Sequence, residues 1–460
     1  MDEYFFEERC CKVVSKTSIK RKKWLLMVVA AILLLAAVAA VCVYVFPIGV
    51  LPVENYSRME ALPADHPLTA EEVRADRDQC IRIVEETHPY FITVEDQSPY
   101  EAAKERYMAA TDGPMTAGGF QSVTAEYLCF FGDGHTGVRW TEAEYLNLPQ
   151  TYADGRTWQL DENGEQICSV ETIGGVAIGE IYATIDRTFP AENEMAQERN
   201  RQNRITGRNL LTLAGAAIND NAVTVTLSNG VEAEYIFRQP GSGASGSGED
   251  NGPVNRWYMD GDVFVVDFNM CDDNDELKAI AAELKKAVDG GCTKVIIDVR
   301  DNPGGSSNAC TRLLNAMGMG APQYDMLVRF SPLAQQGRGY LRQSGEFRYT
   351  GSDAAVKRNE NVRLAVLCDR VTFSSATMMC VYVRDGGHGV LIGEPSSNRP
   401  SAYGDILYFS LENSHVNACI SHKQFIRPDE ANTERMLVPD FWVDPTEAYN
   451  AAMDWLAKAN

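Results

Sequence analysis

Three short stretches of this 460-residue chain contain the residue types that acyl transfer needs. Ser374 lies between an apolar run and a helix-like run, and a serine at such a strand-to-helix turn can expose its hydroxyl. His135 lies in the sequence Gly-Asp-Gly-His-Thr-Gly, on a loop beyond a predicted helix. Gly304 and Gly305 follow another apolar run, and the proline before them leaves the next amides free to face an anion. Together these stretches predict a nucleophile, a base and an oxyanion hole.

Each stretch alone also has an ordinary structural interpretation. A serine at a strand-to-helix turn is most often a helix N-cap, and Ser375 could equally be the exposed serine. A glycine pair after a buried strand most often makes a tight turn. His135 on a glycine-rich loop could be a solvated or capping histidine. The combination favours catalysis over any of these.

The segments around these residues alternate between strand-like and helix-like patterns. Strands are predicted at 263–268, 294–299, 364–368 and 390–392, and helices at 275–288, 308–317 and 373–383. Such alternation indicates an α/β fold with a mainly parallel sheet. Gly304 and Ser374 both follow the carboxyl end of a predicted strand, where these sheets bind ligands.

The N-terminus predicts a membrane anchor. Residues 24–46 are 23 consecutive uncharged residues, long enough as a helix to cross a hydrocarbon core of roughly 30 Å. Residues 1–23 hold seven basic and four acidic side chains, and this basic flank places the N-terminus in the cytoplasm. A cleaved signal peptide and a lipoprotein modified at Cys42 are the alternatives. We expect a single-pass protein of the cell membrane with an extracellular catalytic domain.

Composition excludes other classes. The net charge of −22 argues against a nucleic-acid partner, which would need a basic face. Nine of the 12 cysteines follow the apolar run, and an odd number inside apolar stretches predicts small buried residues, not a disulfide framework. No CxxC pair or zinc ligand set occurs, so neither a metal nor a cofactor is implied.

Composition also predicts seven segments. They are a cytoplasmic tail at 1–23, a transmembrane signal anchor at 24–46, a spacer at 47–67, a helical region at 68–144, a module of short strands at 145–240, a Gly/Ser linker at 241–253 and a catalytic core at 254–460. Thr69 and Glu72 predict a capping box at the start of the helical region, and a helix is expected over 192–213 within the module of short strands.

The three stretches resemble the carboxyl-terminal processing peptidases, or tail-specific proteases, and in particular the tricorn-core-like branch. The likeness lies in a DGHT-type loop, a D-x-R-x-N-x-G-G segment after a strand, and a T-x-S turn, over roughly residues 68–450. It implies a crotonase- or Clp-protease-like core. It also implies that 145–240 is a diverged PDZ-like peptide-binding module.

The resemblance assigns roles residue by residue. Ser374 would be the nucleophile, and the amides of Gly304 or Gly305 and of Ser375 would form the oxyanion hole. The branch also supplies a glutamate before a V-P-D element, which is Glu434 here, to orient the histidine; Glu430 and Asp429 are rivals.

One departure concerns the general base. Members with a Ser–Lys dyad have a lysine where this chain has Arg399, and an arginine keeps its proton near neutral pH. The next lysine is Lys423, so His135 is the base that chemistry prefers. Arg399 would instead bind a substrate carboxylate or form a surface ion pair. We expect Tyr403 near the cleft, as a substrate-binding residue.

Two functions from different classes follow. The first is a membrane-anchored serine endopeptidase that cleaves peptides or protein tails through an acyl-enzyme. The second is a catalytically inactive peptide-binding scaffold of the same fold, suggested by Thr377, where many relatives have a glutamate, and by Arg399. A crotonase-like acyl-CoA enzyme is a weaker third possibility. The partner in the first two cases is a peptide or protein, and the sequence does not determine the oligomeric state.

Overall fold

The computed structural model describes residues 24, 27–39, 41–239, 254–351 and 355–458. The chain forms two compact units, Met1–Asn55 with Phe330–Phe347, and Tyr56–Arg329 with Arg348–Asn460. The predicted cytoplasmic tail at 1–23 and the whole predicted linker at 241–253 lie outside the described residues. The other predicted segment boundaries remain predictions.

The smaller unit contains the apolar helix. Met27–Val45 spans 19 residues with a mean hydropathy of 3.0 and no buried part, so it is long and apolar enough to cross a membrane. A helix with these properties near the N-terminus could be a membrane anchor or a signal sequence. The unit also holds α11 (Pro332–Arg338) and the first residues of β15 (Glu346–Tyr349).

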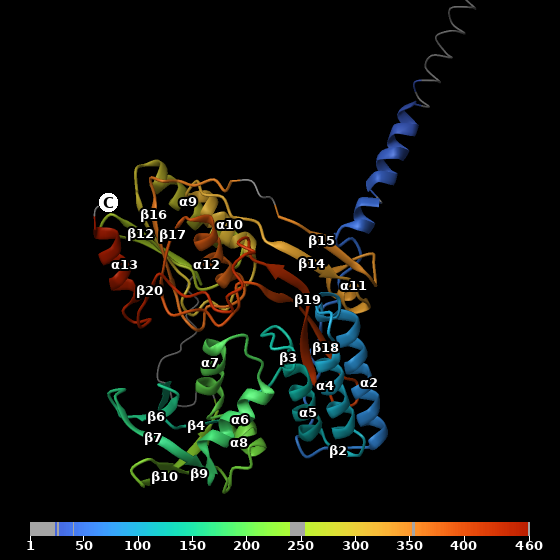
Figure 1. Ribbon diagram of the computed structural model, residues 1–460, viewed down its shortest axis with the longest axis vertical. Helices are drawn as coiled ribbons and strands as arrows, with labels where there is room; N and C mark the ends of the chain where they lie inside the picture. Colours follow the sequence, from blue (N-terminus) through green and yellow to red (C-terminus); the bar gives the residue numbers. More distant parts are fainter. Residues whose placement is uncertain (1–23, 25–26, 40, 240–253, 352–354, 459–460) are drawn as a thin grey trace, which may run out of the picture. The chain divides into compact units, whose positions relative to one another are not determined.

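The larger unit contains a six-stranded sheet (Figure 1). Its order is β11 (Arg256–Asp260), β12 (Val263–Asp267), β13 (Lys294–Asp298), β16 (Arg363–Cys368), β17 (Gly389–Gly393) and β20 (Phe441–Trp442). Neighbouring strands from β12 to β20 are parallel, and β11 is antiparallel to β12. The predicted α/β content is confirmed.

Both faces of this sheet are buried, because alternate residues of each strand point to opposite sides. Phe264 and Val266 of β12 pack in a core with helices α9 (Asp275–Asp289), α10 (Ser307–Ala316) and α12 (Ser375–Gly386). Val263 and Val265 pack on the other face, against α13 (Ala448–Ala457). This continuous apolar character made the strands recognisable in the sequence.

The region before the sheet is helical. It contains α2 (Ala70–Thr87), α3 (Tyr90–Thr93), α4 (Ser98–Ala110) and α5 (Ala117–Cys129), with short strands β1 (Pro67–Leu68) and β2 (Met115–Thr116). The predicted capping box is confirmed, because Thr69 and Glu72 bond reciprocally at the start of α2.

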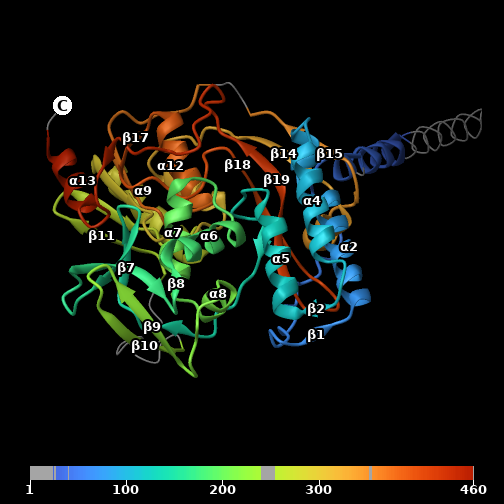
Figure 2. The same cartoon turned by 60° about the horizontal axis from the view of Figure 1, so that its bottom comes forward.

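A second sheet, which is antiparallel, contacts this helical region. The long hairpin of β18 (Ala402–Ser410) and β19 (Asn417–Ile426) pairs through β19 with β14 (Asp325–Arg329) and β3 (Gly137–Val138). Helix α2 packs on β19 (Figure 2). The hairpin therefore joins the strand after His135 to the rest of the larger unit.

Residues 145–238 form a separate antiparallel sheet with three helices. The strands are β4 (Tyr145–Leu146), β5 (Gln150–Ala153), β6 (Arg156–Leu160), β7 (Gln166–Ile173), β8 (Val176–Ala177), β9 (Ala222–Leu227) and β10 (Glu232–Arg238). The helices are α6 (Ile178–Thr188), α7 (Glu194–Arg204) and α8 (Arg208–Leu213). The helix expected over 192–213 is thus two helices, and α6 was not expected.

Candidate active site

Ser374 lies in a strained turn between β16 and α12. Its backbone has φ 53° and ψ −123°, a conformation that residues other than glycine rarely adopt. The side chain makes no N-cap hydrogen bond, although Ser374 occupies the N-cap position. Its amide instead donates to Oδ1 of Asn398 at 2.9 Å. The hydroxyl is therefore left for another role, unlike that of an ordinary capping serine.

The glycine pair lies directly against this turn. A Cβ on Gly304, which has φ 102°, would lie 2.6 Å from the Cβ of Ser374. The Gly304 amide already donates to Oδ1 of Asn302 at 2.8 Å. Among the described residues, no hydrogen bond uses the amides of Gly305 or Ser375, and the Ser375 hydroxyl donates to the Gly305 carbonyl at 2.8 Å. Of the two glycine amides, that of Gly305 is the one available to an oxyanion.

His135 is buried beside the residue that precedes Ser374. Its ring centroid lies 4.7 Å from that of Phe373. Nδ1 lies 3.6 Å from Oδ1 of Asp133 and 3.8 Å from Oε1 of Glu192. Neither ring nitrogen has a hydrogen-bond partner among the described residues. Burial alone would lower the His135 pKa, but the nearby carboxylates outweigh it and raise this pKa above its usual value.

Asp133 links this histidine to a second one. Its Oδ2 accepts hydrogen bonds from Thr136 Oγ1 at 2.6 Å, Ser421 Oγ at 2.7 Å and His88 Nε2 at 3.2 Å. The Tyr90 amide donates to Nδ1 of His88, so Nε2 carries the His88 proton. Burial would raise the Asp133 pKa, but the two histidines hold it well below its usual range. Asp133 is therefore a carboxylate.

Glu192 connects the histidine to the serine turn. Its Oε1 accepts from the Gly134 amide at 3.0 Å, and its Oε2 accepts from Asn398 Nδ2 at 2.6 Å. Asn398 also accepts the Ser374 amide, so one buried amide side chain spans from Glu192 to Ser374. Burial and the nearby Asp133 charge raise the Glu192 pKa. Two carboxyl groups therefore lie beside His135: that of Asp133, with a lowered pKa, and that of Glu192, with a raised pKa.

Comparisons with known proteins agree with this geometry. Residues 261–441, which contain the glycine pair and Ser374, match the model of peptidase family S41. The resemblance to C-terminal processing peptidases is confirmed, and the chain is a serine peptidase, a hydrolase.

Solved structures share the fold over most of the chain. Mature CPAF complexed with lactacystin is 12% identical, with a TM-score of 0.56 over 84% of this chain and 97% of that chain. Mature CPAF alone is 14% identical, with a TM-score of 0.54 over 84% and 96%. At these identities the likeness shows a common fold. No curated protein matches the chain.

The structure does not bring Glu434 to His135. Glu434 is exposed, and its amide donates to Asn432 Oδ1 at 3.0 Å. Among the described residues, the carboxylates within 4 Å of the His135 ring are those of Asp133 and Glu192. The expected orienting residue is therefore corrected to a pair of residues from two other segments.

Arg399 and Tyr403 lie close to this pair. The Arg399 amide donates to Oε2 of Glu192 at 2.9 Å, and its Nε donates to the Glu192 carbonyl at 2.7 Å. It forms no ion pair with any described carboxylate, so the surface ion pair considered from the sequence is not present. The Tyr403 hydroxyl bonds Thr93 Oγ1 at 3.0 Å, and its ring contacts His88 edge-on at 4.7 Å.

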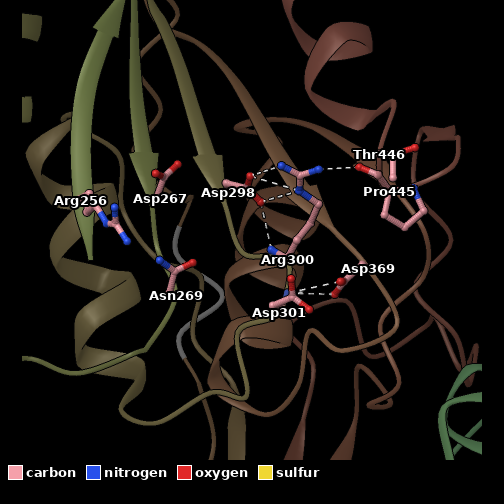
Figure 3. Close-up of a pocket in the computed structure, with 9 residues that line it drawn as sticks. All are labelled: Arg256, Asp267, Asn269, Asp298, Arg300, Asp301, Asp369, Pro445 and Thr446. Atoms are coloured by element: carbon pink, nitrogen blue, oxygen red, sulfur yellow. Dashed lines mark hydrogen bonds and ion pairs between the residues drawn. The ribbon is translucent and has the colours of Figure 1, made fainter. Parts of the chain in front are cut away.

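Hydrogen bonds also hold residues 298–301, the loop that precedes the glycine pair. Arg300 donates to Asp298 at 2.9 Å and to the Pro445 carbonyl, while the Asp301 amide donates to Asp369 at 3.2 Å (Figure 3). Asp369 also accepts amides of the turn that leads to Ser374. These groups line a cavity of about 470 Å³. Neither Ser374 nor His135 lines it, so it is separate from the candidate active site.

The carboxylates also raise the question of a metal. One ligand atom each of Asp133, His135 and Glu192 lie within 4.8 Å of one another, a spacing that could hold a cation. Both carboxylates, however, already accept several N–H and O–H donors. This donor set suits holding a proton on His135 better than ligating an ion.

The sequence missed Asp133, Glu192 and Asn398 as site residues. Asp133 stands two positions before His135, so its position in the DGHT loop was an available signal. Glu192 and Asn398 are separated by 206 positions and meet only in the folded chain. No local pattern marks either one.

Proposed function

We propose that this S41 peptidase uses Ser374 as nucleophile and His135 as general base. The observation that carries the proposal is the strained turn at Ser374, where the hydroxyl makes no N-cap hydrogen bond. Asn398 accepts the Ser374 amide and donates to Glu192, so it connects this turn to a carboxylate beside His135. A nucleophile, a base and a group that orients the base are the three members of a catalytic triad. Asp133 and Glu192 take the orienting role.

The reaction would proceed as an acyl transfer. Neutral His135 takes the Ser374 hydroxyl proton as the oxygen attacks the peptide carbonyl, and Asp133 stabilises the imidazolium that forms. The amides of Gly305 and Ser375 donate to the developing oxyanion. His135 then gives its proton to the leaving amine, and water hydrolyses the acyl-enzyme by the same route.

Lysine chemistry is the competing mechanism, and one contact argues against it. Lys423, the nearest lysine after Ser374 in sequence, pairs with Asp405 at 2.6 Å. The amine of Lys423 is therefore engaged by a carboxylate side chain. A histidine base is therefore favoured over a Ser–Lys dyad.

The surroundings extend the proposal. We infer a membrane-anchored endopeptidase with a cytoplasmic N-terminus and an extracellular catalytic domain, supported by the apolar helix and its basic flank. Residues 145–240 would act as a PDZ-like module, and 254–460 would form a crotonase- or Clp-protease-like core. Arg399 would bind a carboxylate of the substrate, with Tyr403 beside it, because its guanidinium lacks a carboxylate partner among the described residues.

Labelling with a fluorophosphonate probe tests the roles without knowledge of the substrate. The full chain, reconstituted in lipid nanodiscs, should react at one serine. We expect Ser374→Ala and His135→Ala to abolish labelling. Ser375→Ala should retain it at a reduced rate, because that hydroxyl only holds the Gly305 carbonyl.

Two results would contradict the proposal. Labelling that persists in Ser374→Ala but is lost in Ser375→Ala would move the nucleophile by one residue. Absence of labelling in folded wild-type protein would favour the inactive peptide-binding scaffold. Circular dichroism of each variant establishes that it is folded.

A further inference from the structure

A second cavity, of about 460 Å³, lies in the larger unit apart from Ser374 and His135. Its volume falls within the range of about 300–1,000 Å³ typical of small-molecule sites. Five segments line it: residues 58–64, the start of α5, residues 139–141, helix α8 and residues 414–417. It therefore lies where the helical region, the 145–238 sheet and the β18–β19 hairpin meet.

The charge of this cavity is opposite to that of the chain. The protein carries a net charge of −22, yet the lining contains Arg58 and Arg139 and no aspartate or glutamate. Neither arginine has an ion pair with a described carboxylate. Both are exposed residues, and the lining therefore carries two arginines whose charge no ion pair with a described carboxylate compensates.

Both arginines are held in place by uncharged groups. Arg58 Nη2 donates to the Arg139 carbonyl at 3.3 Å and to the Thr141 hydroxyl. The Arg139 guanidinium lies 4.7 Å from the centre of the Tyr408 ring. The chain before Arg58 is itself fixed, because the Tyr56 hydroxyl donates to Asn417 at 2.5 Å. Groups positioned in advance lose little entropy when they bind an anion.

The remaining walls supply an apolar surface. Leu62, Trp140 and Leu213 line the cavity with several small residues. Trp140 packs against Phe189, with ring centroids 5.6 Å apart, so the indole is fixed as well. A ligand with a charged end and a short apolar body would match both parts of the lining.

We propose that this cavity binds a small organic anion, with its carboxylate or phosphate group at Arg58 and Arg139 and its apolar body against Leu62, Trp140 and Leu213. The guanidinium fork matches both oxyanions in geometry. The site lies outside the catalytic machinery, and its binding does not depend on the roles proposed for Ser374 and His135.

Isothermal titration of the full chain in nanodiscs tests the proposal with three probes. They are 4-phenylbutyrate, phenyl phosphate and the neutral 4-phenylbutyramide, each corrected for the heat of empty nanodiscs. We expect at least one anion to bind with a Kd on the order of 0.1–1 mM, as suits ligands of this size. The amide should bind at least tenfold more weakly, and the tighter of the two anions identifies the preferred oxyanion.

Variants of the lining residues distinguish a loss of anion binding from a loss of folded protein. Arg58→Gln and Arg139→Gln should each weaken anion binding about tenfold or more. Arg106→Gln, which removes an exposed arginine of α4, should change nothing. Leu213→Trp narrows the cavity at its apolar wall while keeping both arginines, and should weaken binding. Thermal unfolding of each variant checks that it is folded.

Three outcomes would overturn the proposal. They are equal binding of the amide and the acid, unchanged binding in both arginine variants, and no binding of either anion by wild type at ten times the expected range. Unchanged binding in Leu213→Trp would place any bound anion elsewhere and would likewise refute this site.

Discussion

Replacing Asp133 with asparagine should move the acid limb of the enzyme's pH profile to lower pH. The carboxylate lies 3.6 Å from Nδ1 of His135, and a unit charge at this distance is worth about 4 kcal/mol at an effective dielectric constant of about 20. Without this charge, and with Glu192 still present, we expect the His135 pKa to fall.

The sign follows from the form that reacts. Neutral His135 is the base, and its pKa is raised in the folded enzyme, so wild-type reactivity is lost as pH falls through that raised value. Without the Asp133 charge, the imidazole stays neutral to lower pH. It is also a weaker base with a less stabilised imidazolium, so the plateau rate should fall by about 10²–10⁴-fold.

The assay is the second-order rate of fluorophosphonate labelling between about pH 5 and 9, the interval in which a histidine titrates. No substrate is needed, because the probe reports the reactivity of Ser374 directly. Stability should fall as well, by about 1–3 kcal/mol, since the amide NH2 must replace one carboxylate oxygen and both oxygens of Asp133 accept hydrogen bonds from N–H donors. Urea unfolding measures this loss separately from the labelling rate.

Asp385→Asn is the matched control for this variant. Asp385 is equally buried but pairs with Arg427, and it is not among the charges that act on His135. It should cost stability without moving the acid limb. The reasoning would be refuted if Asp133→Asn left the limb at the wild-type pH, or if Asp385→Asn shifted it equally.

Three further substitutions, one of them with a matched control, test the geometry around the nucleophile. Gly304→Ala puts a Cβ 2.6 Å from that of Ser374 and should abolish labelling. Gly291→Ala is the control, because Gly291 has a similar φ of 100° but a Cβ there would meet nothing within 4 Å. This variant should keep labelling and lose about 1–2 kcal/mol of unfolding free energy in urea. Equal labelling of Gly304→Ala and Gly291→Ala would contradict the proposed contact between Gly304 and Ser374. Lys423→Met should leave the labelling rate within about threefold, because an ion pair such as this contributes little; abolished labelling would support a Ser–Lys dyad. Asn398→Leu leaves the Ser374 amide without its acceptor and should cost about 2–4 kcal/mol together with most of the labelling, and unchanged values would exclude the linking role.

The local sequence pattern was enough to predict strands that are buried on both faces and a helix that begins with a capping box. Continuous apolar runs marked β12, β13 and β16, since strands covered on both sides need apolar residues at every position. The capping box marked α2. The β18–β19 hairpin was not predicted, because its strands mix polar and apolar residues and are stabilised by pairing with each other and with β3 and β14.

The sequence by itself determined which residues could react. Three local features indicated them: a serine at a strand-to-helix turn, a histidine on a glycine-rich loop and a glycine pair after a strand. Each depends on a turn whose backbone conformation is determined by the residues next to it in sequence. The same local chemistry excluded Arg399 as a base, since a guanidinium keeps its proton.

Tertiary structure alone decided which groups surround His135. Glu192 comes from the segment between α6 and α7, and Asn398 follows β17, so their meeting depends on long-range packing. The expected Glu434 has the right chemistry but lies on the surface. A carboxylate acts on a histidine only within a few ångströms, and a short sequence motif does not fix distances between segments 200 residues apart.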